Sequence, residues 1–195
     1  MQLYAITDPE YRSQLHDLVE QWATGGVQFI QLREKTLPAP ELHALASQVT
    51  AKTNQTHTKL LINIATPAST ILARDAGARG VHLAGKPTRG AARAVLQLFP
   101  DAIISLPCHT LEDIELAVQE QADLILFSPI FEKATAQPQG LEALHQACLA
   151  AQTIPVFALG GVTAANAADC VAAGAAGIAG IRLFAENDWR ALPPS

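Results

Sequence analysis

The segment VQFIQLREK, residues 27–35, contains the two features from which the architecture of this chain can be derived. Its first part, Val27–Leu32, is mostly apolar, which is typical of a strand buried on both faces in a parallel sheet. At its end, Gln31, Arg33 and Lys35 occupy every second position, so an extended backbone directs the three side chains to one face. The segment therefore predicts a buried strand whose C-terminal end presents one amide and two cations.

Seven other apolar runs of similar length alternate with longer, helix-like segments. The eight strand-like runs are Leu3–Thr7, Val27–Leu32, Leu60–Asn63, Gly80–Leu83, Ala102–Leu106, Leu124–Phe127, Pro155–Leu159 and Gly177–Ile181. The clearest helix-like segments are Pro40–Thr53, Leu111–Gln121 and Ala165–Ala173, and a short last helix is expected over Glu186–Leu192. Alternating strands and helices predict a parallel sheet, and eight units favour a closed barrel. We therefore predict one compact α/β domain over residues 1–195, a single (β/α)8 TIM barrel.

The composition is that of a compact globular protein and narrows the range of partners. Hydrophobic residues make up 49% of the chain, charged residues 16%, and the net charge is −5 without a block of Lys and Arg, so we expect no nucleic-acid partner. No apolar stretch reaches the roughly 18 residues of a membrane span, so we expect no membrane partner and a cytoplasmic location. Cys108, Cys148 and Cys170 are too scattered to predict disulfides or a thiolate metal site. A homodimer is left open.

In a barrel of this kind, catalytic groups lie at the C-terminal ends of the strands. The amide of Gln31, the guanidinium of Arg33 and the ammonium of Lys35 would together suit a phosphate or a diphosphate. The alternative is an exposed strand end with a surface pair between Glu34 and Lys35. The fold favours the phosphate interpretation, because it places this strand end at the mouth of the barrel.

A second candidate phosphate site follows the seventh and eighth strands. Gly160 and Gly161 end one strand, where small residues let a phosphate approach backbone N–H groups, and Thr163 is positioned to cap the next helix. Gly180 and Arg182 end the next strand, where barrels often bind phosphate. The alternative is a tight turn that needs glycine for a positive φ angle.

Two histidines are candidates for acid–base chemistry. His109 follows the fifth strand and can give and take a proton near neutral pH, with capping or packing as its alternative role. His82 is expected to be a core histidine. A nucleophilic pair of Cys108 and His109 is not expected, because adjacent side chains rarely face one another.

In this order, the segments resemble the thiamine phosphate synthase/TenI superfamily. The resemblance rests on LYAITD (3–8), VQFIQLREK (27–35), LLIN (60–63), AGARGVHL (76–83), HTLED (109–113), ADLILFSPIF (122–131), IPVFALGGVTAAN (154–166) and AGAAGIAGI (173–181). It implies a phosphorylated thiazole as substrate. It also implies that Gln31, Arg33 and Lys35 stand at the family's diphosphate-binding positions, that Asn63 matches the family's asparagine, and that Gly160 and Gly161 form the thiazole phosphate loop.

The sequence departs from a synthase at the expected Mg²⁺ ligands. Ile64 follows Asn63 in place of the family's aspartate, and AGKP at 84–87 replaces a segment with a second acidic ligand. Mg²⁺ usually keeps one or two carboxylates beside substrate phosphates. We therefore expect no metal and no cofactor, with Mg²⁺ required only if the chain is a synthase.

The resulting expectation is a thiamine biosynthesis enzyme, in the first place a TenI-like thiazole tautomerase that works by proton transfer without metal. His109 would be the catalytic residue, and Arg33, Lys35 and Lys133 would hold the substrate carboxylate. Gly160, Gly161, Gly180 and Arg182 would bind the phosphate. Two alternatives stay open. One is a thiamine phosphate synthase with an altered diphosphate site, which joins hydroxymethylpyrimidine diphosphate to thiazole phosphate. The other is a non-catalytic regulatory protein that binds these phosphates.

Overall fold

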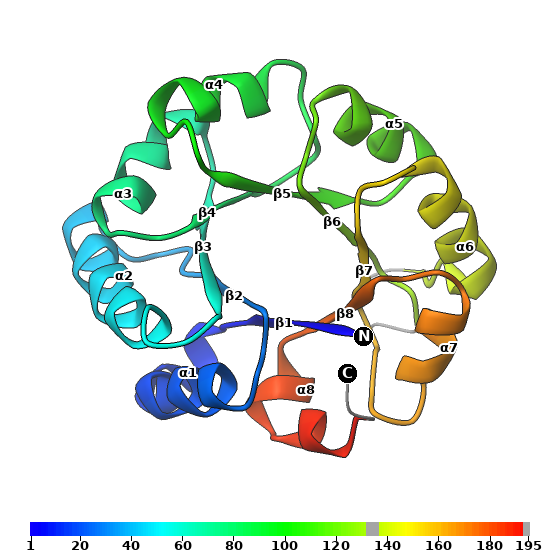
Figure 1. The fold of residues 1–195 in the computed structure, drawn as a ribbon, viewed down its shortest axis with the longest axis horizontal. Helices are drawn as coiled ribbons and strands as arrows, with labels where there is room; N and C mark the ends of the chain where they lie inside the picture. Colours follow the sequence, from blue (N-terminus) through cyan, green and yellow to red (C-terminus); the bar gives the residue numbers. More distant parts are fainter. Residues whose placement is uncertain (132–136, 193–195) are drawn as a thin grey trace.

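The computed structural model describes residues 1–131 and 137–192, in which eight parallel strands close into a barrel in chain order. The strands are β1 Gln2–Ile6, β2 Phe29–Leu32, β3 Lys59–Ile64, β4 Gly80–Leu83, β5 Ile103–Cys108, β6 Leu124–Phe127, β7 Val156–Ala158 and β8 Gly177–Gly180. Figure 1 looks along the barrel and shows the strands as an inner ring with the helices outside it. The predicted (β/α)8 barrel is confirmed, and the strand ends lie within two residues of the predicted ones.

Helices follow the strands around the outside of the barrel (Figure 1). They are α1 Leu15–Thr24, α2 Ala39–Thr53, α3 Thr70–Asp75, α4 Ala91–Leu98, α5 Leu111–Gln119, α6 Gly140–Ala150, α7 Ala167–Ala172 and α8 Arg182–Ala185, with short 3₁₀ turns η1 Pro9–Gln14, η2 Pro67–Ser69 and η3 Asp188–Ala191. The prediction of a short last helix over Glu186–Leu192 is wrong in position, because α8 begins directly after β8. Asn187, with a φ angle of 64°, separates α8 from η3.

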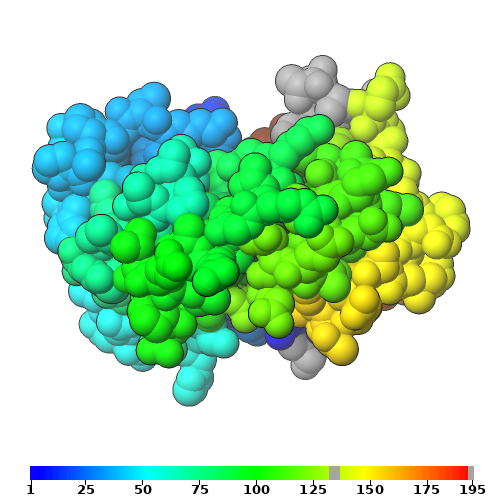
Figure 2. All heavy atoms as spheres, turned by 90° about the horizontal axis from the view of Figure 1, so that it is seen from above, coloured from blue at the N-terminus to red at the C-terminus, as the bar shows by residue number. Residues whose placement is uncertain are grey.

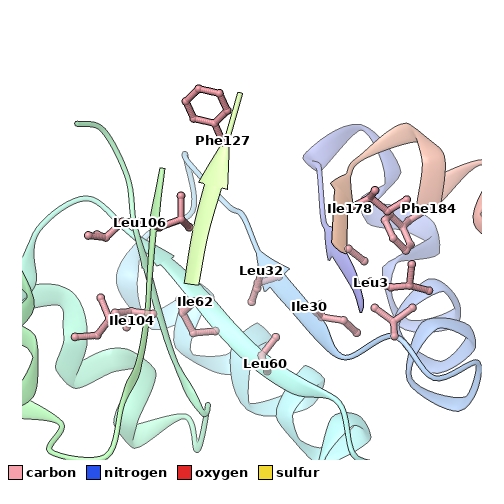
Figure 3. Close-up of a cluster of buried hydrophobic side chains, with 14 of the residues drawn as sticks. Leu3, Ile30, Leu32, Leu60, Ile62, Ile104, Leu106, Phe127, Ile178 and Phe184 are labelled. Carbon is pink, nitrogen blue, oxygen red and sulfur yellow. The ribbon is translucent and has the colours of Figure 1, made fainter. Parts of the chain in front are cut away.

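Alternate residues of each strand face opposite sides of the barrel wall. The outward residues form the main core against the helices, and Figure 3 shows part of this cluster, with Leu3, Ile30, Leu32, Leu60, Ile62, Ile104, Leu106, Phe127 and Ile178 from the strands and Phe184 from α8. Facing inward is a smaller cluster that contains the aromatic rings of Tyr4, Phe29 and Phe157, whose centroids are 5.5 to 5.8 Å apart. Because these rings fill the barrel interior, the inward positions nearer the C-terminal strand ends remain for polar side chains.

Two local predictions about helix starts have different outcomes. The helix predicted from Leu111 is confirmed as α5, and Thr110 caps it, because the Thr110 hydroxyl accepts from the Asp113 N–H and the Asp113 carboxylate accepts from the Thr110 N–H. The prediction that Thr163 caps α7 is wrong, because α7 begins only after Asn166. The Asn166 side chain instead accepts from the Thr163 N–H at 2.8 Å and donates to the Gly161 carbonyl at 3.1 Å, which holds the loop after β7.

Within residues 1–131 and 137–192, no helix combines the length and the hydropathy that crossing a membrane would require.

Candidate active site

A cavity of about 830 Å³ opens at the C-terminal ends of the strands. Its lining contains Ile6, Gln31, Arg33, Lys35, Asn63, His82, Ala84, Gly85, Pro107, His109, Leu126, Ser128, Pro129, Gln137, Pro138, Gln139, Leu159, Gly160 and Ile181. In Figure 2 the molecule is hollowed along its upper edge, between the blue segments that follow β2 and the yellow-green segment that precedes α6. The volume falls within the range of about 300–1,000 Å³ for small-molecule sites.

The structure brings most of the predicted site residues together. Gln31, Arg33, Lys35, Asn63, His109 and Gly160 all line this cavity, so their predicted placement at one mouth is confirmed. Gly161, Gly180 and Arg182 line an adjoining cavity of about 350 Å³, which shares Leu159, Gly160 and Ile181 with the first. Lys133 lies outside the described residues.

The cationic side of the cavity follows β2. Arg33 donates to the carboxylate of Asp8 at 2.9 Å, so part of its charge is already balanced inside the protein. Lys35 is exposed at the mouth and has no hydrogen-bond or ion-pair partner among the residues described. The alternative of a Glu34–Lys35 surface pair is wrong, because the buried carboxylate of Glu34 is paired with Arg12 of η1. The exposed ammonium of Lys35 therefore remains available to a ligand.

The floor of the cavity is a buried polar layer. Gln31 donates from Nε2 to Asn63 Oδ1 at 2.9 Å, and the Nδ1 atom of His82 lies 2.9 Å from the hydroxyl of Ser105. His82 is buried as predicted, but its ring also lines the cavity. Burial, with a smaller contribution from the charge of Arg33, lowers the pKa of His82 to about 3. The imidazole is therefore neutral at physiological pH.

His109 lies at the rim, just past β5. Its backbone N–H donates to the Asp113 carboxylate at 2.8 Å, which fixes the position of the residue. Its Nδ1 lies 2.7 Å from the Ser128 carbonyl, and because a carbonyl only accepts, Nδ1 carries the proton. In the neutral ring, Nε2 is then unprotonated and able to act as a base. Burial raises the pKa of the neighbouring Cys108 thiol to about 12, so this cysteine is not a thiolate nucleophile.

The opposite side of the site is built from backbone. Gly160 and Gly161 have φ angles of 93° and 69°, and the N–H groups of Gly161 and Val162 have no hydrogen-bond partner in the part of the chain that is described. A Cβ atom on Gly160 would lie 2.8 Å from Pro129, so only glycine fits there. The turn interpretation of these glycines is correct, and it is compatible with phosphate binding, since the same conformation leaves N–H groups free.

Arg182 is exposed on the wall of the adjoining cavity, together with the two acids Glu186 and Asp188. These carboxylates reduce the positive potential that Arg182 brings to this side.

The donor set does not match a magnesium site of the expected kind. None of the described residues that line the main cavity is an acid, and nowhere among residues 1–131 and 137–192 do three His, Cys, Asp or Glu side chains converge as metal ligands. Asp8, the first acidic residue after β1, is paired with Arg33. The lining therefore supplies cations and amides where Mg²⁺ would need carboxylates.

Some lining residues were not predicted. Gln137 and Gln139 precede α6, and the Gln139 amide donates to the Ser128 carbonyl, which His109 also contacts. No pattern in the sequence marks these glutamines. His82, by contrast, has a signal: it occupies an inward position two residues after Gly80 in β4, and alternation places it on the same face as Asn63 of β3.

The thiamine monophosphate synthase family model matches residues 3–184 of this chain. The chain belongs to the thiamine monophosphate synthase family. It is 38% identical over 189 residues to putative thiamine-phosphate synthase 2 of Aquifex aeolicus, covering 94% of this chain and 97% of the relative. It is 37% identical to the thiamine-phosphate synthase of Methanoculleus marisnigri, covering 99% and 92%. The predicted superfamily is confirmed.

A solved structure agrees with this assignment. The thiamine phosphate pyrophosphorylase of Pyrococcus furiosus superposes with a TM-score of 0.83 at 26% identity, over 97% of this chain and 90% of that one. The predictions that the chain is an enzyme and that it takes part in thiamine biosynthesis are confirmed by membership of the thiamine monophosphate synthase family. The relatives named here are called synthases or pyrophosphorylases, so they favour the alternative prediction over the tautomerase placed first.

Proposed function

We propose that this protein is a thiamine-phosphate synthase, which joins hydroxymethylpyrimidine diphosphate to thiazole phosphate and releases diphosphate. The observation that carries the proposal is that two anion-suited subsites face one another across connected cavities. The amide and cation subsite consists of Gln31, Arg33, Lys35 and Asn63, and the backbone subsite contains Gly160 and Gly161. An enzyme that joins two phosphorylated substrates needs two such places. The names of the relatives support the same reaction.

Each of the two subsites would bind the phosphate groups of one substrate. The amide and cation subsite would hold the diphosphate, and the backbone N–H groups of Gly161 and Val162 would hold the single phosphate of the thiazole. The same cavity is also lined by the apolar side chains of Ile6, Leu126 and Ile181, which suit two uncharged rings. As the bond between the pyrimidine methylene and the diphosphate oxygen breaks, the thiazole nitrogen forms the new bond to that carbon. The electron pair of the broken bond leaves with the diphosphate.

The proposal includes an altered diphosphate site. Because the described lining does not fit Mg²⁺, we derive no step through a metal. The charge of the departing diphosphate would instead be balanced by Arg33 and by Lys35, with hydrogen bonds from the amides of Gln31 and Asn63. Fixed cations that face a developing negative charge are a common source of rate enhancement.

The test is direct. The purified protein is incubated with hydroxymethylpyrimidine diphosphate and thiazole phosphate, with Mg²⁺ or with a chelator, and both thiamine phosphate and diphosphate are measured. We expect equal amounts of the two products, and a chelator effect much smaller than that on a synthase with both acidic ligands. Absence of thiamine phosphate under both conditions would exclude the synthase.

A thiazole tautomerase is the second candidate, because the described lining of the main cavity combines His109 with cations and lacks acids. Nε2 of His109 would take a proton from the ring, and Arg33 and Lys35 would hold the substrate carboxylate. A positioned acid–base group typically contributes about 10²–10⁴-fold, so His109→Gln should slow aromatisation of the dihydrothiazole carboxylate phosphate by about that factor. His43→Gln, an exposed histidine of α2, is the matched control. An unchanged rate in His109→Gln would remove this histidine from the mechanism.

A further inference from the structure

A hydrogen-bond network under the cavity is centred on a residue that does not itself line the cavity. Tyr4 of β1 is fully buried, and its hydroxyl lies 3.2 Å from Gln31 Oε1 and 3.4 Å from the Ser105 hydroxyl. Gln31 in turn contacts Asn63, and Ser105 contacts His82. Tyr4 therefore joins two branches, and each branch ends in a side chain that lines the cavity.

The positions of the protons follow from the acceptors. Gln31 Nε2 donates to Asn63 Oδ1, so the atom of Gln31 that faces Tyr4 is its carbonyl oxygen, which only accepts. The single phenolic proton of Tyr4 is therefore used in the bond to Gln31, and in the longer contact with Ser105 the serine hydroxyl is the group that donates. Burial raises the pKa of Tyr4 above its ordinary value, so this proton is retained at physiological pH.

The orientation of the Gln31 amide determines which group Asn63 presents to a ligand. The side-chain carbonyl oxygen of Asn63 accepts from Gln31, so the NH₂ group of Asn63 is left free to donate, and this group has no partner among the described residues. Asn63 lines the cavity beside Arg33 and Lys35, where a donor is required to bind an anion. If the Gln31 amide turned over, its carbonyl would face Asn63, and Asn63 would then present a carbonyl oxygen to the anion.

We propose that the Tyr4 hydroxyl is a positioning group that fixes the amide orientation of Gln31 and, through it, turns the NH₂ of Asn63 toward a bound diphosphate. This proposal rests on the proposed diphosphate subsite. The rest of the Tyr4 side chain has a separate role, because its ring packs against Phe29 and Phe157. Replacement by phenylalanine keeps that packing and removes only the group in question.

The experiment is a calorimetric titration of the whole protein with inorganic diphosphate. We expect Tyr4→Phe to weaken diphosphate binding by about five- to tenfold. This is the scale of one lost hydrogen bond, here the one between the NH₂ group of Asn63 and the diphosphate. Tyr11→Phe is the matched control, because Tyr11 also donates to a side chain, Glu186, but does so outside the main cavity. The control should bind diphosphate like the wild type.

A double-mutant cycle separates positioning from a general effect on structure. Asn63→Ala alone should weaken diphosphate binding, and Tyr4→Phe added to Asn63→Ala should weaken it no further, because the residue through which Tyr4 acts is gone. Ser105→Ala tests the other branch and should leave diphosphate affinity unchanged. Thermal melts of all variants identify any that unfold, and Ser105→Ala and Tyr11→Phe show the effect of losing a hydroxyl elsewhere.

The outcomes are distinct. Unchanged affinity in Tyr4→Phe, an additive loss in the Asn63→Ala background, or an equal loss in Ser105→Ala would each overturn the role of Tyr4 while leaving the diphosphate subsite intact. Failure of the wild type to bind diphosphate would overturn the subsite itself, and the inference with it. A loss in Tyr4→Phe that disappears in the Asn63→Ala background would support the proposal.

Discussion

The two anion subsites of this protein use opposite means. The amide and cation subsite, after β2 and β3, consists of the side chains of Gln31, Arg33, Lys35 and Asn63. Gln31 and Asn63 are held by a hydrogen bond and Arg33 by an ion pair, while Lys35 has no partner among the described residues. The subsite after β7 and β8 consists of the backbone of glycines and their neighbours, with Arg182 exposed at its edge. Charge therefore dominates the first subsite and backbone conformation the second. The two should respond differently to substitution, salt and pH.

The largest effect is expected from a change to the backbone subsite. Gly160→Ala would place a Cβ atom 2.8 Å from Pro129 at a φ angle of 93°, so the loop must move. We expect about a 100-fold loss of turnover, because small misplacements of a substrate carry costs of this size. Stability should fall by about 2–3 kcal/mol, from strain and the clash together.

The matched control for Gly160→Ala is Gly26→Ala. Gly26 has a φ angle of 86°, but a Cβ atom there would meet nothing within 4 Å. The Gly26→Ala variant should lose some stability from backbone strain and keep the turnover of the wild type. Urea unfolding and product formation measure the two effects, and equal turnover losses in both variants would refute the specific role of the loop after β7.

The next largest effect is expected from removing a charge from the amide and cation subsite. Arg33→Ala should weaken diphosphate binding by about 10- to 100-fold, the scale of a charged hydrogen bond, and leave inorganic phosphate binding at the glycine loop nearly unchanged. Part of the loss comes from the Asp8 carboxylate, which would lose its partner Arg33. Asp8→Asn added to Arg33→Ala should therefore restore some affinity. Calorimetry checks both variants, and a parallel loss of phosphate affinity would contradict the separation of the subsites.

The buried polar layer at the floor of the cavity contains a titratable group, His82. Because the pKa of His82 is lowered to about 3 in the folded protein, the unfolded chain alone binds its proton as the pH falls below about 6.5. The free energy of unfolding should therefore decrease between about pH 6.5 and pH 3, by at most about 1.4 kcal/mol per pH unit, and not change from this source above pH 6.5.

His82→Gln should remove this part of the acid dependence, and His43→Gln, which is exposed on α2, should not. Urea unfolding at a series of pH values measures the slope. The same slope in His82→Gln and in the wild type would show that His82 binds its proton at the same pH in the folded protein as in the unfolded chain.

The smallest effect is expected at Arg182. Because it is exposed and shares its cavity with Glu186 and Asp188, Arg182→Ala should weaken inorganic phosphate binding by no more than about threefold, and less at high salt. Calorimetry at two salt concentrations tests this. A loss above about tenfold would place Arg182 among the groups that hold the phosphate directly.

Much of the site could be predicted from local pattern. Period-two alternation placed Gln31, Arg33 and Lys35 on one face, and the rule that barrel sites lie at C-terminal strand ends placed Asn63, His109 and Gly160 at the same mouth. Two local details fail because of contacts that the strand and helix pattern does not show. The alternative of a Glu34–Lys35 surface pair fails because Glu34 is paired with Arg12 of η1, and the predicted Thr163 cap fails because the Asn166 side chain accepts from the Thr163 N–H and α7 begins only after Asn166.

The sequence alone was therefore sufficient to predict the barrel, the end of the barrel that contains the site and the types of side chain found there. These features follow from short-range periodicity and from the topology of parallel strands. Only the folded chain shows which polar groups satisfy one another: Arg33 with Asp8, His82 with Ser105, and Tyr4 with both Gln31 and Ser105. Tyr4 and Ser105 are 101 residues apart in sequence. Closure of the barrel is what brings such distant side chains within hydrogen-bond distance, and no local pattern records it.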